Sequence, residues 1–341
     1  MILVSMKLLI LTQAVDLDNP ILGFFHEWIV QLALRAESIH VICLFKGRHS
    51  LPKNVTVHSL GKEGGESKVK YLFRFYNYVW KLRREYEAIF VHMNQEYCLL
   101  GGPMWRVLNK RVYLWRNYHH GTLVTDLAAL FCTKVFCTSK SSYTAQYKKT
   151  TLMPVGVDTG IFAPNPAVHR VPNSVLFLSG MWPSKRPELL IEALETLAAD
   201  SVEFSANIYG SPLAETSAYY ESIVESVKTK GLVKHIQFYP GVTLAASPKL
   251  FQSHAVFVNC SFSGMFDKTM LEAAACGAQV VAASDDFALL AGEQSHFTSA
   301  DSLALRLKEA FLRSTSGAAP VFVQEHSLIS LMNRLIVSIK S

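Results

Sequence analysis

The sequence predicts an α/β protein made of two Rossmann-like, doubly wound domains in tandem. Its 341 residues exceed what one hydrophobic core usually supports. Short apolar runs alternate with amphipathic stretches in both halves, which is typical of parallel sheets covered by helices. The segment 153–172 is dense in Pro and Gly and interrupts both periodicities, as an interdomain linker would. Half of the residues are hydrophobic and 18% are charged, which excludes a disordered or fibrous chain.

In the first half, the apolar runs predict five buried strands and the longer amphipathic stretches predict three helices. The strands are expected near residues 7–12, 40–44, 88–92, 111–115 and 134–137. The helices are expected near residues 22–35, 68–84 and 141–147. This order indicates one doubly wound domain.

The same pattern restarts after the linker. Strands are expected near residues 174–179, 203–209, 236–239, 255–259 and 279–282. Helices are expected near residues 187–199, 218–230 and 268–276, with a final helix over 328–339. Two such units favour a ligand site in a cleft between them.

The charge is divided unevenly. Residues 1–153 hold 20 Lys and Arg against 10 Asp and Glu, a net +10, whereas residues 154–341 hold 13 against 17, a net −4. A basic first half suits an acidic partner such as a phosphorylated lipid, an anionic membrane surface or a nucleic acid. The nucleic acid is the least favoured, because no known reading module accompanies the basic residues.

Location and cysteine chemistry follow from simple patterns. No apolar run is long enough to span a membrane, and the apolar start lacks a basic leader and a cleavage site, so we expect a buried strand there and a cytoplasmic protein. The six cysteines form no CxxC pair and are expected to be reduced and buried, not metal ligands.

The most informative stretch is 256–281. It is predicted to be a strand, a loop with Ser and Gly, a helix capped by Asp267, a stop at Gly277 and a second strand. A loop that feeds a helix start offers free backbone N–H groups to a phosphate. Glu272 lies just over one turn into this helix, where its carboxylate could accept two hydrogen bonds from a ribose diol.

This stretch resembles the donor-site signature of the family 4 glycosyltransferases, in which two glutamates stand eight positions apart before an Ala-rich helix that ends at Gly. The second glutamate corresponds to Glu272, but the first falls on Gly264, at a position that usually contacts the donor sugar. The resemblance implies a donor-binding set in which Asp267 or Lys268 substitutes for that glutamate. The set on this stretch is Gly264, Asp267, Lys268, Thr269 and Glu272.

Two further stretches carry the resemblance. Residues 175–194 look like the strand, glycine turn, basic residue and helix that open the family's donor domain, which implies that Lys185 binds phosphate. The family's turn arginine has no counterpart at 179–181, and Arg186 is the candidate to supply its charge. A diphosphate leaving group needs such cations. Residues 153–162 resemble the Gly-Val-Asp segment that precedes the family's linker.

In the first half the resemblance is one of topology. Gly23 is what remains of the family's Gly-rich loop, and His26 either lines the cleft or is an ordinary helix histidine. After the strand 111–115, His119 is preferred over His120 as the histidine that faces the donor sugar, with a solvated loop histidine as the alternative. The aromatic and basic segment 68–84 either contacts anionic lipid head groups or is an ordinary domain helix.

The resemblance implies a GT-B architecture, with two Rossmann-like domains facing a central cleft. We expect an acceptor-side domain over 1–155, a C-terminal helix at about 327–341 that packs back on it, and a nucleotide-sugar donor domain over 156–326. The implied enzyme transfers a sugar from a UDP- or GDP-sugar to a glycan or lipid-linked acceptor with retention of configuration. It needs no metal or other cofactor, and His119 and Glu272 are its catalytic candidates. The implied pathway is the assembly of a surface polysaccharide.

Two alternatives stay open at this point. One is a non-catalytic homologue that binds a sugar nucleotide, and the other is a sugar-nucleotide epimerase on the same scaffold. A fold by itself does not choose among them.

Overall fold

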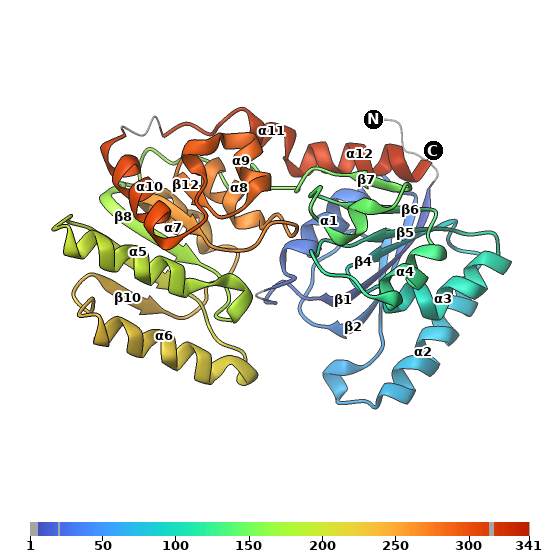
Figure 1. Cartoon of the computed structure of the whole chain (residues 1–341). Helices are drawn as coiled ribbons and strands as arrows, with labels where there is room; N and C mark the ends of the chain where they lie inside the picture. The colour runs from blue at the N-terminus through green and yellow to red at the C-terminus, as the bar shows by residue number, and fades with distance from the viewer. Residues whose placement is uncertain (1–5, 20, 314–316, 341) are drawn as a thin grey trace. The chain divides into compact units, whose positions relative to one another are not determined.

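The computed structural model describes residues 6–19, 21–313 and 317–340, which form two compact α/β units (Figure 1). The first unit contains the described residues up to Met153 together with those from Leu331 onward. The second unit is Pro154–Ser330.

The first unit is built on a seven-stranded parallel sheet with the order β3-β2-β1-β4-β5-β6-β7. Its strands are β1 (Lys7–Val15), β2 (Ser38–Lys46), β3 (Val55–Ser59), β4 (Ala88–His92), β5 (Arg111–Trp115), β6 (Lys134–Cys137) and β7 (Thr150–Leu152). Strand order reverses direction at β1, which has β2 on one side and β4 on the other. Leu8, Leu9, Ile10 and Leu11 are all fully buried, because a parallel sheet is covered on both faces.

Helices cover both faces of this sheet. They are α1 (Phe24–Ala33), α2 (Lys68–Lys81), α3 (Glu96–Val107), α4 (Leu123–Leu130) and the C-terminal part of α12 (Leu328–Lys340). Residues of α2, α3 and α4 share one core cluster, in which Phe75 meets Trp105 with ring centroids 6.3 Å apart. The end of α12 is anchored to two strands: Tyr113 Oη donates to Ile339 O at 2.8 Å, and Lys134 Nζ donates to Ser338 O at 3.1 Å.

The second unit has a five-stranded parallel sheet with the order β10-β9-β8-β11-β12. Its strands are β8 (Val171–Leu178), β9 (Ser205–Tyr209), β10 (Ile236–Tyr239), β11 (His254–Asn259) and β12 (Gln279–Ala282). Its helices are α5 (Pro187–Ala199), α6 (Ser217–Thr229), α7 (Ser247–Ser253), α8 (Lys268–Ala275), α9 (Asp285–Ala291), α10 (Ala300–Leu312) and α11 (Phe322–Glu325).

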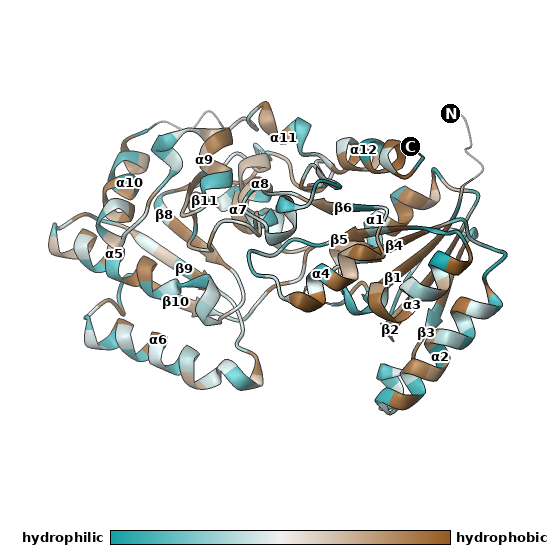
Figure 2. Cartoon of the chain, turned by 45° about the vertical axis from the view of Figure 1, so that its right-hand side comes forward, coloured by the Kyte–Doolittle hydropathy of each residue, from teal (hydrophilic) through white to brown (hydrophobic). Residues whose placement is uncertain are grey.

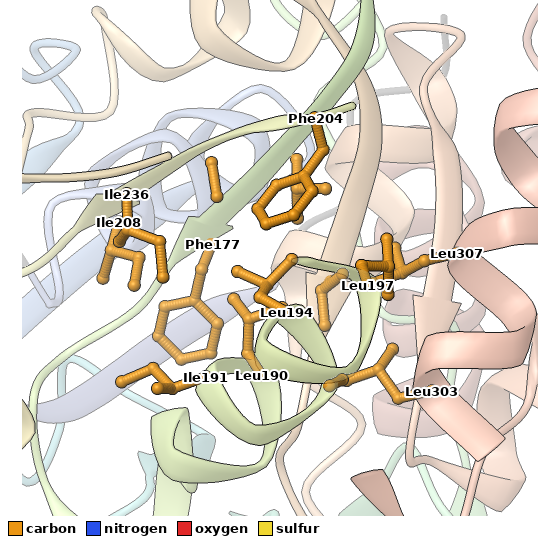
Figure 3. Close-up of a cluster of buried hydrophobic side chains, with 14 of the residues drawn as sticks. Phe177, Leu190, Ile191, Leu194, Leu197, Phe204, Ile208, Ile236, Leu303 and Leu307 are labelled. Carbon is orange, nitrogen blue, oxygen red and sulfur yellow. The ribbon is translucent and has the colours of Figure 1, made fainter. Parts of the chain in front are cut away.

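One face of this sheet is packed mainly by α5 and α10 (Figure 3). Leu190, Leu194 and Leu197 recur at the spacing of one helix face and are fully buried. They meet strand residues such as Phe177 and, from α10, Leu303. The other face belongs to a second cluster formed by α7, α8, α9 and α11.

Several predicted elements are confirmed with the predicted bounds, namely 88–92, 111–115, 134–137, 236–239, 279–282 and the helix 187–199. All six cysteines are buried and free, as expected. None of the helices in the described ranges is long and apolar enough to cross a membrane.

One predicted helix is absent. The helix expected at 141–147 is only a 3₁₀ turn over Tyr143–Gln146, because nearby hydroxyls bond locally to the backbone, as when Ser139 Oγ accepts from Ser141 N at 2.9 Å. The chain passes from the first unit to the second between Met153 and Pro154, inside the segment predicted to be a linker, and the residues after this point are packed. Val157 and Phe162 are buried in the second unit, and the N–H groups of Gly156 and Val157 both donate to His326 O at 2.9 Å.

Candidate functional site

Two loops of the second unit meet at the carboxyl ends of the neighbouring strands β8 and β11. The loop after β8 ends in a 3₁₀ turn, Pro183–Lys185, and the loop after β11 leads to the first turn of α8. Lys185 Nζ lies 2.5 Å from Asp267 Oδ2 and 3.3 Å from Ser261 Oγ. The structure therefore joins two residues that the sequence analysis assigned to donor binding, although 82 positions separate them.

Asp267 is the N-cap of α8, as predicted. Its Oδ1 accepts hydrogen bonds from Thr269 N at 3.3 Å and Thr269 Oγ1 at 2.9 Å. Burial raises the pKa of the Asp267 carboxyl, but the charge of Lys185 and these hydrogen bonds outweigh burial and lower the pKa to about 2. An ionised carboxylate thus holds together the donors at the start of the helix.

Arg186 follows Lys185 in a left-handed backbone conformation, with φ at 47°. Its Nε donates to Cys260 O at 2.7 Å, and its guanidinium lies 3.9 Å from the ring centroid of Phe262. The Phe262 side chain is 46% exposed. Arg186 therefore ties the two loops together and places a cation over an accessible ring.

Lys268 and Glu272 stand one turn apart on α8, and Glu272 is buried. Burial raises the pKa of the Glu272 carboxyl to about 7, an effect that nearby Lys268 reduces and Asp267 increases. Burial lowers the pKa of Lys268, against the opposing charges of Glu272 and Asp158. Near neutral pH Glu272 is therefore poised between an acceptor and a donor of hydrogen bonds.

The loop between β11 and α8 is held by the start of α9, which the sequence analysis missed. Gly264, at a φ of 96°, donates its N–H to Asp286 Oδ2 at 3.2 Å. Ser263 Oγ lies 2.9 Å from Asp285 Oδ2 and accepts from Asp285 N at 2.9 Å. The available signal was the Ser-Asp-Asp run that follows the strand 279–282, a common helix start.

The candidates of the first unit have other surroundings. His26 is buried in α1, and its Nε2 accepts from Ser50 N at 3.1 Å; burial lowers its pKa, so the ring is neutral and structural. A Cβ at Gly23 would lie 2.7 Å from Asn19 O, so close packing explains this glycine. His119 is half-buried beside His120, with ring centroids 4.1 Å apart, and burial followed by the His120 charge lowers its pKa.

Chemically, the cluster around Asp267 is a set of cationic and N–H donors that already holds one anion. Within the described part of the chain, His, Cys, Asp and Glu form no group of three or more placed to bind a metal ion. These two loops and α8 carry six of the predicted donor-binding residues: Lys185, Arg186, Asp267, Lys268, Thr269 and Glu272.

Comparison of sequences connects the second unit with known enzymes. Residues 172–310 match the family described as "Glycosyl transferases group 1". The D-inositol 3-phosphate glycosyltransferase of Kineococcus radiotolerans is 28% identical in an alignment of 155 positions that covers 42% of this chain and 36% of that protein. The enzyme of the same name from Mycobacteroides abscessus is 29% identical in an alignment of 137 positions that covers 38% of this chain and 30% of that protein. The match therefore spans about a third of the length of these curated relatives.

Comparison of structures extends over the whole chain. HepE of Anabaena, solved in complex with UDP and glucose, superposes with a TM-score of 0.78 at 18% identity and covers 99% of this chain and 100% of its own. The chain has the GT-B fold. Sucrose-phosphate synthase of Thermosynechococcus elongatus superposes with a TM-score of 0.74 at 15% identity, covering 98% of this chain and 97% of its own. The predicted GT-B fold class, with two Rossmann-like units, is thus confirmed.

Proposed function

We propose that this GT-B protein is a glycosyltransferase that moves a sugar from a UDP- or GDP-sugar to a glycan or lipid-linked acceptor. The observation that carries the proposal is the pairing of Lys185 with the capped start of α8, inside the segment 172–310 that matches the glycosyltransferase family. Support comes from HepE, which has been solved with UDP and with UDP-glucose.

In this proposal the second unit, 156–326 in the predicted division, binds the donor. Lys185 and Arg186 hold the diphosphate together with the N–H groups at Lys268 and Thr269. The Glu272 carboxylate accepts from the ribose hydroxyls, and Gly264 leaves room beside the sugar. Cations at this position matter most as the sugar–phosphate bond breaks, because negative charge then builds on the leaving diphosphate.

The first unit, 1–155 with the helix near 327–341, binds the acceptor in this proposal. His119 orients the donor sugar, while Gly23 and His26 support the acceptor side through the packing of α1. The acceptor oxygen bonds to the anomeric carbon with retention, and the bond from that carbon to the diphosphate breaks. The departing phosphate oxygen takes the proton of the acceptor hydroxyl, so neither a protein base nor a metal is required. The cytoplasmic location of the protein and its role in the assembly of a surface polysaccharide remain predictions.

A second candidate function is sugar-nucleotide binding without transfer. It is favoured by the Asp267 carboxylate, which already accepts hydrogen bonds from Lys185 and Thr269, and by Gly264, which stands where the resemblance places a glutamate. Release of free nucleotide from a nucleotide-sugar in the presence of acceptor would reject it. Conversion of the sugar without acceptor would instead identify an epimerase.

The test is calorimetry with UDP, GDP, ADP and their common sugar conjugates. Wild type is compared with Lys185→Ala and Glu272→Ala, and with Lys234→Ala as a control for the loss of an exposed lysine. We expect one nucleotide to bind to wild type and to the control and to bind far more weakly to both site variants. Binding by Lys185→Ala and Glu272→Ala at wild-type affinity would show that the donor site lies elsewhere.

A further inference from the structure

Helix α2 of the first unit exposes a stripe of large apolar side chains. Val69, Phe73, Tyr76 and Trp80 are 77%, 74%, 40% and 53% exposed, respectively. Their spacing of four, three and four residues places them on one face of the helix. Figure 2 shows apolar residues along α2 interspersed with polar ones. Exposed apolar surface of this kind, when contiguous, marks an interaction site.

The exposed stripe is not a sign of a loosely attached helix. The opposite face of α2 buries Phe75 and Val79, and the Phe75 ring stacks on Tyr97 at 5.7 Å. Tyr76 Oη donates to Leu100 O at 3.1 Å, and Tyr86 Oη donates to Val79 O at 3.1 Å. The helix is fixed on α3 and the sheet, so the stripe faces away from a packed core.

The charged residues within the segment 68–84 all have the same sign. Residues 68–84 contain six Lys or Arg and no Asp or Glu. Glu66 pairs with Lys70 at 2.7 Å and with Arg74 at 2.9 Å, but in the part of the chain that the structure describes no carboxylate pairs with Lys68, Lys81 or Arg84. On a helical wheel Lys70 and Lys81 fall beside the apolar stripe, at about 100° and 120° when Val69 is set at 0° and each residue turns about 100°, and Arg84 follows the end of the helix.

We propose that α2 docks this protein on the surface of an anionic lipid bilayer. Val69 and Phe73 enter the boundary of head groups and acyl chains, Tyr76 and Trp80 lie at the level of the head groups, and the flanking cations neutralise lipid phosphates and carboxylates. The guanidinium of Arg83 lies 4.2 Å from the Trp80 ring centroid and adds a further cation at the same edge.

Charge decides between this surface and a second copy of the chain. Two α2 stripes brought face to face would set the cations of one copy against those of the other, because, among the described residues, Glu66 pairs only with Lys70 and Arg74 and residues 68–84 contain no acidic side chain. An anionic bilayer offers both an apolar interior for the stripe and head groups of the opposite charge. This inference does not depend on the donor site, which lies in the second unit.

The experiment is co-sedimentation of the full chain with vesicles of phosphatidylcholine alone or of phosphatidylcholine mixed with phosphatidylserine. The Phe73→Ser/Trp80→Ser variant removes two of the apolar side chains that contact the bilayer, and the Lys81→Glu/Arg84→Glu variant reverses two charges. The matched control is Leu127→Ser/Leu130→Ser, since these leucines of α4 are 52% and 63% exposed and the segment 123–130 carries no basic residue.

We expect wild type and the control to bind the mixed vesicles and not the phosphatidylcholine vesicles, with affinity that falls as salt is added. Charge reversal should weaken binding by about 30-fold or more, since each surface cation contributes about fivefold. The Phe73→Ser/Trp80→Ser variant should weaken binding by about tenfold or more.

Equal binding to both vesicle types, wild-type binding by the Phe73→Ser/Trp80→Ser variant, or an equal loss in the control would overturn the proposal. A concentration-dependent dimer in sedimentation equilibrium that Phe73→Ser/Trp80→Ser abolishes, without vesicle binding by wild type, would identify a second copy as the occupant. Unchanged thermal unfolding and unchanged nucleotide calorimetry would show that a variant has lost the surface alone.

Discussion

Replacing Asp267 with Asn should weaken the fold and tighten the binding of a nucleoside diphosphate. The Asp267 carboxylate accepts from Lys185 Nζ at 2.5 Å, Ser261 Oγ at 3.4 Å, Thr269 N at 3.3 Å and Thr269 Oγ1 at 2.9 Å. These are the donors that a phosphate at the start of α8 would need. A diphosphate must therefore displace this carboxylate or bind against its charge.

The magnitude follows from the pKa of Asp267, which lies at about 2 instead of 3.8. A depression of this size corresponds to roughly 2 kcal/mol of stability from the ionised form. The contribution is fully present above pH 3.8 and is lost as the pH falls through about 2. The Asp267→Asn variant should therefore unfold at lower urea with a loss of about 2 kcal/mol at pH 7, and the difference from wild type should shrink towards pH 2.

Relief of the same interaction should favour a phosphate that takes its place. If the whole of this roughly 2 kcal/mol becomes available to binding, UDP affinity rises by up to about 30-fold, because 1.4 kcal/mol is a factor of ten. Calorimetry with UDP measures this change, and Asp267→Ser serves as a second variant that keeps a capping side chain without the charge. UDP binding that is unchanged or weaker in both folded variants would refute the idea that the carboxylate occupies the phosphate position.

Three further predictions concern other parts of the chain. Glu272 has a pKa of about 7 against 4.5 for an ordinary Glu, so its protonated form stabilises the fold, and the free energy of unfolding should fall by about 3 kcal/mol as the pH rises from 4.5 to 7. Urea unfolding at pH 5 and pH 8 should show a smaller difference in the free energy of unfolding for Glu272→Gln than for wild type. Leu194→Ala should cost about 2–5 kcal/mol in urea unfolding, because the side chain is fully buried, whereas Leu305→Ala, at 54% exposure, should cost little. Truncation after Ser330 should make the first unit sensitive to protease while the second unit, Pro154–Ser330, stays resistant, since Leu331 and Leu335 are fully buried; equal resistance of both units would contradict this.

Sequence periodicity predicted the central strands well because strands covered on both faces are continuously apolar. It failed for β3, an edge strand with half-exposed residues between Val55 and Ser59, where the apolar signal is weak. It also failed for α3, because Gly101, Gly102 and Pro103 indicate a break. Packing overrides that local signal: a Cβ at Gly102 would lie 2.4 Å from the Phe131 ring, so the glycine permits the close approach of neighbouring segments.

The candidate site was predictable where its residues are close in sequence. The Asp267 cap and Glu272 follow from one strand-loop-helix pattern. The contact between Lys185 and Asp267, and the support of Gly264 by Asp286, join residues 82 and 22 positions apart. Neither contact is encoded in a local pattern, since each depends on the order in which strands enter the sheet. The sequence therefore named the donor candidates without showing that one of them, Asp267, neutralises another.

The return of α12 to the first unit has a consequence for biosynthesis. Pro154–Ser330 holds all strands of its own sheet and can fold as soon as it leaves the ribosome. The first unit is translated earlier, but the side chains of Tyr113 on β5 and Lys134 on β6 receive their hydrogen-bond acceptors, Ile339 O and Ser338 O, only after the second unit has been translated. Until then the side chains that α12 covers stay open to solvent, so the first unit is completed after the second although its strands are translated before it, and it needs protection from aggregation for longer.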